Sequence, residues 1–268
     1  MIAILLHGGA GDWPEKQLFP AKKILEKAAS KGLSLLQKNK KSIDVVEKCI
    51  NILEDSGIFN AGSGCAKQRD GRARADACIM GEDLRCGCVA ALEGIKNPIS
   101  VARAVMEKTG HILLVGKFAK DFALKNHFEK IRTKNSAQKN EETVGCLALD
   151  SFGNLSAGNS TGGLKNAIPG RVGDSALIGA GIYANEFAAA VTTGTGEAFI
   201  KTSLARIACV MIENGIKPQY AAEKCVKIIS EKTGKKGGII ILDRKGNHGT
   251  SHNSKNMPWV CKSTKAFS

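Results

Sequence analysis

The stretch that decides the fold is TVGCLALD, residues Thr143–Asp150. It opens with a threonine directly after a long polar, lysine-rich segment and continues as an apolar run of strand length. Such a short run of apolar and β-branched residues predicts a buried strand. A threonine at the start of a strand is ordinary by itself, so its meaning depends on the residues that follow it.

Three short loops beyond this strand are rich in hydroxyl groups and glycine. They contain Asn159–Gly163 (NSTGG), Pro169–Ser175 (PGRVGDS) and Thr192–Glu197 (TTGTGE). Acyl transfer at an N-terminal threonine needs an activated hydroxyl and donors that stabilise an oxyanion. The loops offer hydroxyls, glycine N–H groups, one Arg and one Asp. The sequence therefore predicts a hydrolase that must cut itself before Thr143 to become active.

The composition is that of a globular protein. The chain has 268 residues, of which 43% are hydrophobic and 24% charged, so it can bury a full core. No apolar run approaches the roughly 20 residues of a membrane helix, and no membrane partner is expected. The run Ile2–Leu6 is too short for a signal-peptide core and predicts a buried strand.

The nine cysteines favour reduced thiols in a cytoplasmic protein. Their number is odd, they form no CxxC pair, and most lie in apolar runs. Cys86 and Cys88 are the closest pair and are interpreted as two small core residues. Neither a zinc site nor a disulfide framework fits this spacing, so free thiols and a cytoplasmic location are predicted.

The formal net charge of +14 raises the question of a nucleic-acid partner. The lysines are scattered along the whole chain, and two Tyr and two Trp leave few rings for base stacking. We therefore expect a solvated lysine-rich surface and no specific nucleic-acid partner, with non-specific polyanion binding at low salt.

Helix and strand patterns alternate along the chain. They predict helices at 16–38, 43–53 (with Ser42 as N-cap), 98–108, about 118–124, 197–214 and 218–232. They predict strands at 2–6, 86–92, 112–115, 144–149, 155–157, 177–184, 188–193, 238–243 and 247–251. They also predict a hairpin around an Asp70-Gly71 turn, with one strand before the turn and one at 73–80 after it. Residues 125–142 form the one good linker. This order predicts a single α+β domain of two stacked sheets between helical layers, a four-layer αββα sandwich.

Other catalytic chemistries fit the sequence less well. The His7–Gly11 segment lacks the full GxGxxG spacing, so a dinucleotide site is disfavoured and His7 is interpreted as structural. The sequence has neither a GxSxG elbow nor an HExxH motif, and it contains only five histidines. An N-terminal threonine needs no histidine, because its own α-amine, with a pKa near ~8, can accept the hydroxyl proton.

Taken together, the motifs resemble the plant-type (type III) asparaginase and isoaspartyl peptidase family of N-terminal-nucleophile hydrolases. The resemblance spans nearly the whole chain and rests on ordered segments: His7–Gly11, Phe59–Gly64, Asp76–Met80, Thr143–Asp150, Ser160–Gly163, Gly170–Ser175, Gly179–Gly181 and Thr193–Glu197. It implies an inactive precursor with this αββα fold. Cleavage between Glu142 and Thr143 would give an α subunit, residues 1–142, and a β subunit, residues 143–268.

The resemblance also implies roles for single residues. Thr143 would be the nucleophile in self-cleavage and in hydrolysis, with Thr161 beside it tuning its hydroxyl. Thr193 and Gly194 would form the oxyanion hole and contact substrate, and Asn60 would steady the nucleophile's amine. The implied reaction hydrolyses isoaspartyl dipeptides and L-asparagine through a β-aspartyl ester on Thr143 and releases aspartate.

Substrate and ion binding are implied in the same way. Arg171 would hold the substrate α-carboxylate and Asp174 its α-ammonium, so the bond cut would hang from the side-chain carbonyl. No catalytic cofactor is expected. Carbonyl groups of one loop would bind a structural sodium ion, in the segment made of Leu53, Glu54, Asp55, Phe59, Ala61 and Ser63. The family also implies a homodimer of αβ units.

Several alternatives stay open at this point. Arg171 and Asp174 could be a surface ion pair, worth at most about 1 kcal/mol, and Thr161 and Thr193 could be turn residues. Glycosylasparaginase and threonine aspartase are rivals within the fold. Glu142 stands where the family commonly has Gly or Asp, which predicts slow cleavage. It also leaves room for an uncleaved, non-catalytic relative that binds a polyanion.

Overall fold

The protein is described by a computed structural model that covers residues 1–131 and 143–264. The N-terminal part contains β1 (Ile2–His7), α1 (Glu15–Gln37), α2 (Ser42–Asp55), η1 (Gly62–Gly64), β2 (Arg74–Gly81), β3 (Cys86–Glu93), α3 (Pro98–Lys108), β4 (Leu113–Val115) and α4 (Gly116–Lys125). The C-terminal part contains β5 (Val144–Leu149), β6 (Leu155–Thr161), η2 (Asp174–Ala176), β7 (Ile182–Ala184), β8 (Ala188–Gly194), α5 (Gly196–Thr202), α6 (Leu204–Glu213), α7 (Pro218–Thr233), β9 (Gly237–Asp243), β10 (His248–His252) and β11 (Trp259–Thr264).

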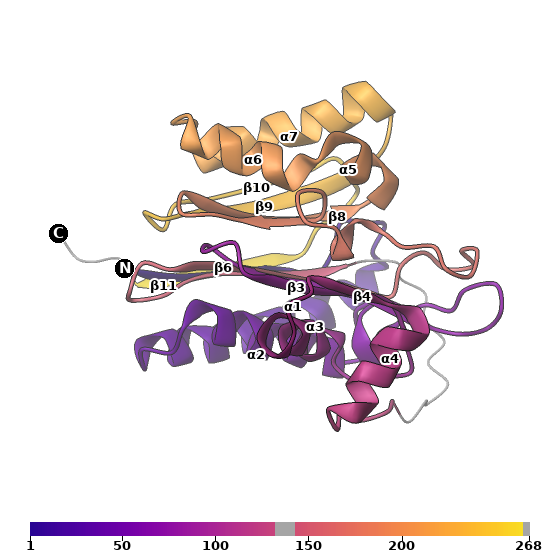
Figure 1. Ribbon diagram of the computed structural model, residues 1–268. Helices are drawn as coiled ribbons and strands as arrows, with labels where there is room; N and C mark the ends of the chain where they lie inside the picture. The colour runs from indigo at the N-terminus through magenta and orange to yellow at the C-terminus, as the bar shows by residue number, and fades with distance from the viewer. Residues whose placement is uncertain (132–142, 265–268) are drawn as a thin grey trace.

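The strands form two sheets. The larger has seven strands in the order β11-β1-β5-β6-β2-β3-β4, and the smaller has four in the order β10-β9-β8-β7. Figure 1 shows the sheets lying face to face, with α1–α3 outside the larger sheet and α6 and α7 outside the smaller one. The prediction of an α+β protein with two sheets and flanking helices is confirmed.

Strand alternation explains why the sheets stack. In β1, Ile4 and Leu6 belong to the apolar cluster under α1 and α2, whereas Ala3 and Leu5 belong to the cluster between the sheets. Successive side chains of a strand point to opposite faces, so a strand covered on both sides reads as a continuous apolar run. A third cluster joins the smaller sheet to α5–α7.

Most predicted elements are confirmed, with boundaries shifted by a few residues, but five details are wrong. Ser42 lies inside α2, and Lys41 is its N-cap. The Ser42 hydroxyl contacts Ser156 Oγ at 2.8 Å instead of capping the helix. The helix expected at 197–214 is two helices, because Ser203 has φ 50° and breaks it.

The other three errors concern strands. Directly before the Asp70-Gly71 turn the described residues form no strand, and Lys67 makes only an isolated bridge with Ala73. The strand expected at 177–184 is confined to Ile182–Ala184, and turns precede it. Strand β11 was not predicted, although it pairs antiparallel with the whole length of β1. The linker expected at 125–142 lies largely outside the described residues, since only its first part, to residue 131, is described.

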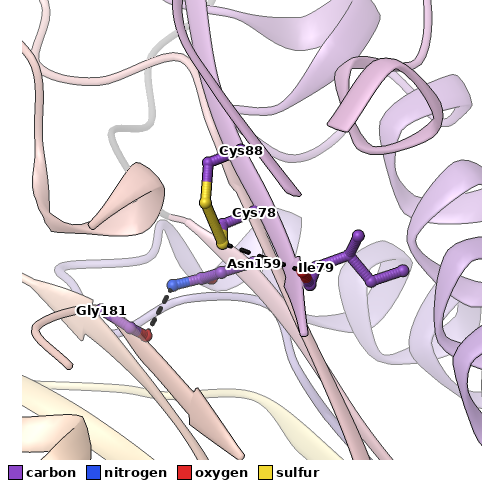
Figure 2. The surroundings of a disulfide bond; sticks show 5 residues. All are labelled: Cys78, Ile79, Cys88, Asn159 and Gly181. Carbon is purple, nitrogen blue, oxygen red and sulfur yellow. Dashed lines mark hydrogen bonds between the residues drawn. A yellow bond between two sulfur atoms is a disulfide. The ribbon is translucent and has the colours of Figure 1, made fainter. Parts of the chain in front are cut away.

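The cysteine prediction is wrong for one pair. Cys78 of β2 and Cys88 of β3 face each other in the antiparallel ladder, with Cα atoms 4.1 Å apart, and form a disulfide (Figure 2). The other seven cysteines are free, as expected. The β2–β3 hairpin places these two residues, ten apart in the chain, directly opposite each other, and spacing in the sequence does not show such a pairing.

Within residues 1–131 and 143–264, no helix is both long and apolar enough to cross a lipid bilayer. This agrees with the expectation from hydropathy along the sequence.

Candidate active site

Thr143 lies at the head of β5, where the chain enters the centre of the larger sheet. Its side chain and backbone are largely buried, with 6% of the residue exposed. Val144 pairs with Ser160 in the antiparallel β5–β6 ladder. One residue further along the same register, Thr143 comes opposite Thr161, so the predicted nucleophile and its predicted neighbour are side by side.

Both threonines belong to the face of the sheet that looks toward the smaller sheet. In β5, Leu147 and Leu149 pack in the cluster between the sheets. Thr143 is an even number of residues from both, so it belongs to the same face. In β6, Asn159 has the parity of Thr161 and donates its Nδ2 to Gly181 O and Thr192 O at 3.0 and 3.2 Å. Figure 2 shows the Asn159–Gly181 bond reaching across to the second sheet.

Thr193 approaches the same end of the molecule from the smaller sheet. It is fully buried near the end of β8, and its Oγ1 accepts a hydrogen bond from Ala10 N at 3.1 Å. Ala10 follows β1, whose last residue His7 pairs with Gly145 of β5. Gly194 has φ 130° and lies against the backbone of Gly237, where a side chain would clash. Both residues therefore lie at the edge where Thr143 begins its strand.

Asn60 is buried, and its hydrogen bonds differ from the predicted role. Its Nδ2 donates to Gly163 O at 2.7 Å, and its Oδ1 accepts from Ala66 N at 2.8 Å. Its backbone oxygen accepts from Gly162 N. The side chain thus fixes the turn after Thr161, while the predicted contact with the amine of Thr143 stays a prediction.

Arg171 is largely buried, with 16% of its side chain exposed, and it does not pair with Asp174. Its Nε and Nη2 donate to the two carboxylate oxygens of Glu197, each at 3.0 Å. Such a two-point bond fixes the plane of a guanidinium. This partner excludes the alternative of a simple Arg171–Asp174 surface pair. The Nη1 atom lies toward Gly163 and Gly173, where added Cβ atoms would come within 3.5 and 3.0 Å of it.

Asp174 is buried at the start of η2. Its Oδ2 accepts a hydrogen bond from Thr192 Oγ1 at 2.7 Å. Burial raises the pKa of Asp174 to about 6, opposed by the Thr192 hydrogen bond and by the charge of Arg171. A buried carboxylate with a raised pKa is suited to bind a cation. The attraction of the positive charge offsets the free-energy cost of burying the ionised carboxylate.

His7 is fully buried between the sheets, as a structural histidine would be. Burial lowers its pKa to about 3, partly opposed by the nearby backbone of Thr143. Neither ring nitrogen makes a well-aligned hydrogen bond to the described residues. A neutral ring packs at Gly145, where a Cβ atom would collide with its Nε2. His7 therefore shapes the space beside Thr143.

The segment predicted to hold sodium is a compact loop between α2 and η1. Glu54 O accepts from Ser63 Oγ at 2.7 Å, Phe59 O from Ala61 N at 2.8 Å and Leu53 O from Ser56 Oγ at 2.7 Å. Leu53 O accepts a second bond, from Ser56 N at 3.3 Å. Carbonyl oxygens are ligands that suit a hard cation such as Na⁺. The donor set of the six predicted residues therefore fits the ion chemically.

Sequence reasoning missed the roles of three acidic side chains around this site, although Glu54 was named in the sodium loop for its carbonyl group. Glu197 holds Arg171, Asp76 accepts the Gly173 N–H at 2.9 Å, and the buried Glu54 carboxylate accepts Ser160 Oγ at 2.7 Å. All three were inside quoted motifs, so a signal was present in the sequence. Their partners are 26, 97 and 106 residues away in the chain, and a linear motif does not show such pairs.

The arrangement supports nucleophilic acyl transfer. A hydroxyl at a strand head, a second hydroxyl opposite it, and a third from the facing sheet meet at one edge of the two sheets. A fixed guanidinium and a buried carboxylate follow on the 170–174 loop. Within the described residues no group of three or more His, Cys, Asp or Glu side chains could hold a metal ion.

Comparison with known proteins agrees with this geometry. The model of the family described as Asparaginase matches residues 1–141 and 129–268. The chain is 40% identical to the plant-type L-asparaginase of Pyrococcus abyssi, over 97% of this chain and 96% of that protein. It is 38% identical to the isoaspartyl peptidase/L-asparaginase of Rattus norvegicus, over 97% and 85% of the two chains.

A third relative is the isoaspartyl peptidase of Salmonella typhimurium, which is 36% identical over 95% of this chain and 93% of its own length. Relatives of this identity that match almost end to end confirm the resemblance inferred from the motifs, and with it the prediction of an enzyme. The chain is a hydrolase that belongs to the asparaginase family.

Proposed function

We propose that this protein hydrolyses β-aspartyl amide bonds, in isoaspartyl dipeptides and L-asparagine, after cutting itself before Thr143. The observation that carries the proposal is the placement of Thr143 opposite Thr161, at the edge where Thr193 arrives from the other sheet. The printed names of the relatives, plant-type L-asparaginase and isoaspartyl peptidase, support this substrate class.

Maturation would be an acyl shift followed by hydrolysis. Thr143 Oγ attacks the carbonyl carbon of Glu142, the C–N bond breaks, and the acyl group passes to oxygen as the nitrogen becomes a free amine. Water then cleaves the ester and leaves a carboxylate on residue 142. The proposal makes residues 1–142 and 143–268 the two subunits of one domain, with the αββα architecture of N-terminal-nucleophile hydrolases.

Hydrolysis would reuse the same atoms. The Thr143 amine takes the hydroxyl proton, and Oγ attacks the side-chain carbonyl of the substrate. Thr193 Oγ1 and Gly194 N–H would stabilise the oxyanion, as buried donors placed in advance do most effectively. Ammonia or an amino acid leaves with the proton, and water releases aspartate from the β-aspartyl ester on Thr143. Thr161 would tune the nucleophile.

The substrate head would bind to the 170–174 loop. The Arg171 plane is fixed by Glu197, and Nη1 remains for an α-carboxylate. Asp174, buried with Oδ2 bonded to Thr192, would take the α-ammonium. A site that binds both the free α-carboxylate and the free α-ammonium would exclude ordinary peptides as substrates, because an α-carboxyl group in a peptide bond is not free.

Three further parts of the proposal concern the whole protein. A sodium ion would support the loop of Leu53, Glu54, Asp55, Phe59, Ala61 and Ser63 without entering the reaction. Seven free cysteines favour a cytoplasmic location. Two αβ units would pair, and exposed apolar side chains along β4 and α4, such as Val115 and Phe118, are available for that contact.

The test is the variant Thr143→Ala. It should abolish both self-cleavage and turnover of L-asparagine and β-aspartyl dipeptides, because neither step has another nucleophile. Thr264→Ala is the matched control and should retain both, because Thr264 pairs with Ile2, at the end of β1 away from His7 and the site. Turnover that persists in Thr143→Ala would refute the mechanism. An uncleaved, inactive wild-type chain would favour the non-catalytic relative suggested by Glu142.

A further inference from the structure

Asp76 is a buried carboxylate at the start of β2, where the β2–β3 ladder shifts register between Ala75 and Ala77. It lies on the same face of β2 as Cys78 and Met80, which pack between the sheets, and it pairs with Thr161 of β6. Asp76 therefore belongs to the same face and the same edge as the two threonines of the proposed site.

Both carboxylate oxygens of Asp76 are used by backbone N–H groups. Oδ1 accepts from Ala91 N at 2.8 Å, and Oδ2 accepts from Gly173 N at 2.9 Å. Ala91 has φ 50°, a conformation that non-glycine residues rarely adopt, and it lies at the irregularity of β3. The first bond thus anchors the carboxylate to the sheet, and the second reaches out to the loop.

Gly173 lies between the two residues that would bind the substrate head, Arg171 and Asp174. That end of the loop is also tied to other elements, through Thr192 Oγ1 to Asp174 and through Glu197 to Arg171. Those bonds reach β8 and α5. The Asp76–Gly173 bond instead joins the loop to β2, the strand next to Thr161.

We propose that Asp76 is a positioning residue that sets the separation between the head-binding loop and the nucleophile. This inference rests on the proposed function. Asp76 touches neither the substrate nor the reacting atoms in this account; it acts through Gly173. Placement matters because misplacing a bound group by about 1 Å can cost on the order of 10²-fold in rate.

The charge of Asp76 agrees with the proposal. Burial raises its pKa, while the two N–H donors and the charge of Arg171 oppose the rise. An ionised Asp76 would accept both N–H groups at once. The isosteric variant Asp76→Asn replaces one oxygen with an NH₂ group, so either Ala91 or Gly173 loses its acceptor.

The experiment compares two substrates that differ only in the head: L-asparagine and succinamate, which lacks the α-ammonium. In Asp76→Asn, self-cleavage should persist, and the preference for asparagine, as a ratio of kcat/KM values, should shrink at least tenfold. A general loss of packing would lower kcat/KM for both substrates alike. Asp150→Asn is the matched control, since Asp150 is also buried and accepts backbone N–H groups, from Ser42, Phe152 and Asn154, at the far end of β5.

Asp150→Asn should leave the preference unchanged. If Asp76→Asn does not fold, the pair Gly173→Pro and Gly173→Ala replaces it. Both substitutions add a Cβ atom beside Arg171 Nη1, but only proline removes the N–H of residue 173. The preference for asparagine should therefore be smaller in Gly173→Pro than in Gly173→Ala. If the preference for asparagine is unchanged in Asp76→Asn, or is no smaller in Gly173→Pro than in Gly173→Ala, the inference is overturned while the proposed function stands. A wild-type chain that cleaves neither asparagine nor isoaspartyl dipeptides overturns the proposed function and this inference with it.

Discussion

Asp174 is the residue through which pH should act on ligand binding. Burial raises its pKa to about 6, so the carboxylate is charged above pH 6 and becomes protonated below it. An α-ammonium group needs the charged form. We therefore expect the affinity for L-aspartate, the proposed product, to fall about tenfold between pH 7 and pH 5, since each pH unit below the pKa removes about tenfold of the anion.

Isothermal titration calorimetry on cleaved protein would measure this change without interference from the pH dependence of turnover. Asp174→Asn is the control: aspartate should bind it weakly, with little change over the same pH range. An affinity for aspartate that stays constant from pH 7 to pH 5 in the wild-type protein would show that Asp174 does not receive the ammonium group.

Single residues also show how far the sequence alone reaches. Thr143, Thr161, Arg171 and Asp174 lie in short motifs whose chemistry can be recognised without a structure. Glu197 lay in a quoted motif as well, but its bond joins helix α5 to Arg171, 26 residues earlier in the chain. Only the fold brings Glu197 beside Arg171. The sequence therefore indicated Arg171, which would bind the substrate α-carboxylate, but not Glu197, which fixes the plane of its guanidinium.

Among the elements, helix α2 carries a fully buried acidic side chain, Glu54. The Glu54 carboxylate is fully buried, and burial raises its pKa to about 8, although bonds from Ser160, Ile99 and Asn97 oppose the rise. An acid whose pKa is higher in the folded than in the unfolded state retains a proton that the unfolded chain releases. Stability should therefore fall as the pH rises from about 4.5 to about 8.

Glu54→Gln should remove this penalty because its amide does not titrate. Relative to wild type, the variant should gain stability on going from pH 5 to pH 9, on the order of a few kcal/mol at most, measured by thermal unfolding at both pH values. Glu47→Gln, on the same helix and partly exposed, should show no such gain. Equal effects of Glu54→Gln at pH 5 and pH 9 would contradict the assignment.

Element boundaries were predictable where the pattern and a local stop signal agreed. Pro98 opens α3 at the predicted residue, because proline suits the first turn of a helix. The break at Ser203 carries no such signal, since the apolar pattern continues through α5 and α6. Likewise β11 is short and half polar, and its place is fixed by pairing with β1 at the other end of the chain.

At the scale of the whole molecule, the two predicted subunits are interleaved in one sheet. β1 comes from residues 1–142 and lies between β11 and β5, which come from residues 143–268. β6 then pairs with β2 across a third boundary between the subunits. Cutting the chain before Thr143 breaks one peptide bond and leaves all these ladders intact.

Cleaved protein should therefore elute from a sizing column as one particle, and its two fragments should separate only in denaturant. This follows from the paired backbone groups, each of which would lose its partner if a subunit left. Fragments that separate in native buffer would contradict the interleaved sheet.

The central claim is that Thr143 becomes an N-terminal nucleophile, and intact mass tests it most directly. Freshly purified protein and protein kept warm for days should be weighed under denaturing conditions, with Thr143→Ala alongside. The account predicts that the 28.3 kDa wild-type chain gives way to two fragments split between Glu142 and Thr143, slowly because of Glu142, while the variant stays whole. A wild-type chain that stays whole yet hydrolyses asparagine, or a cut at any other bond, would contradict it.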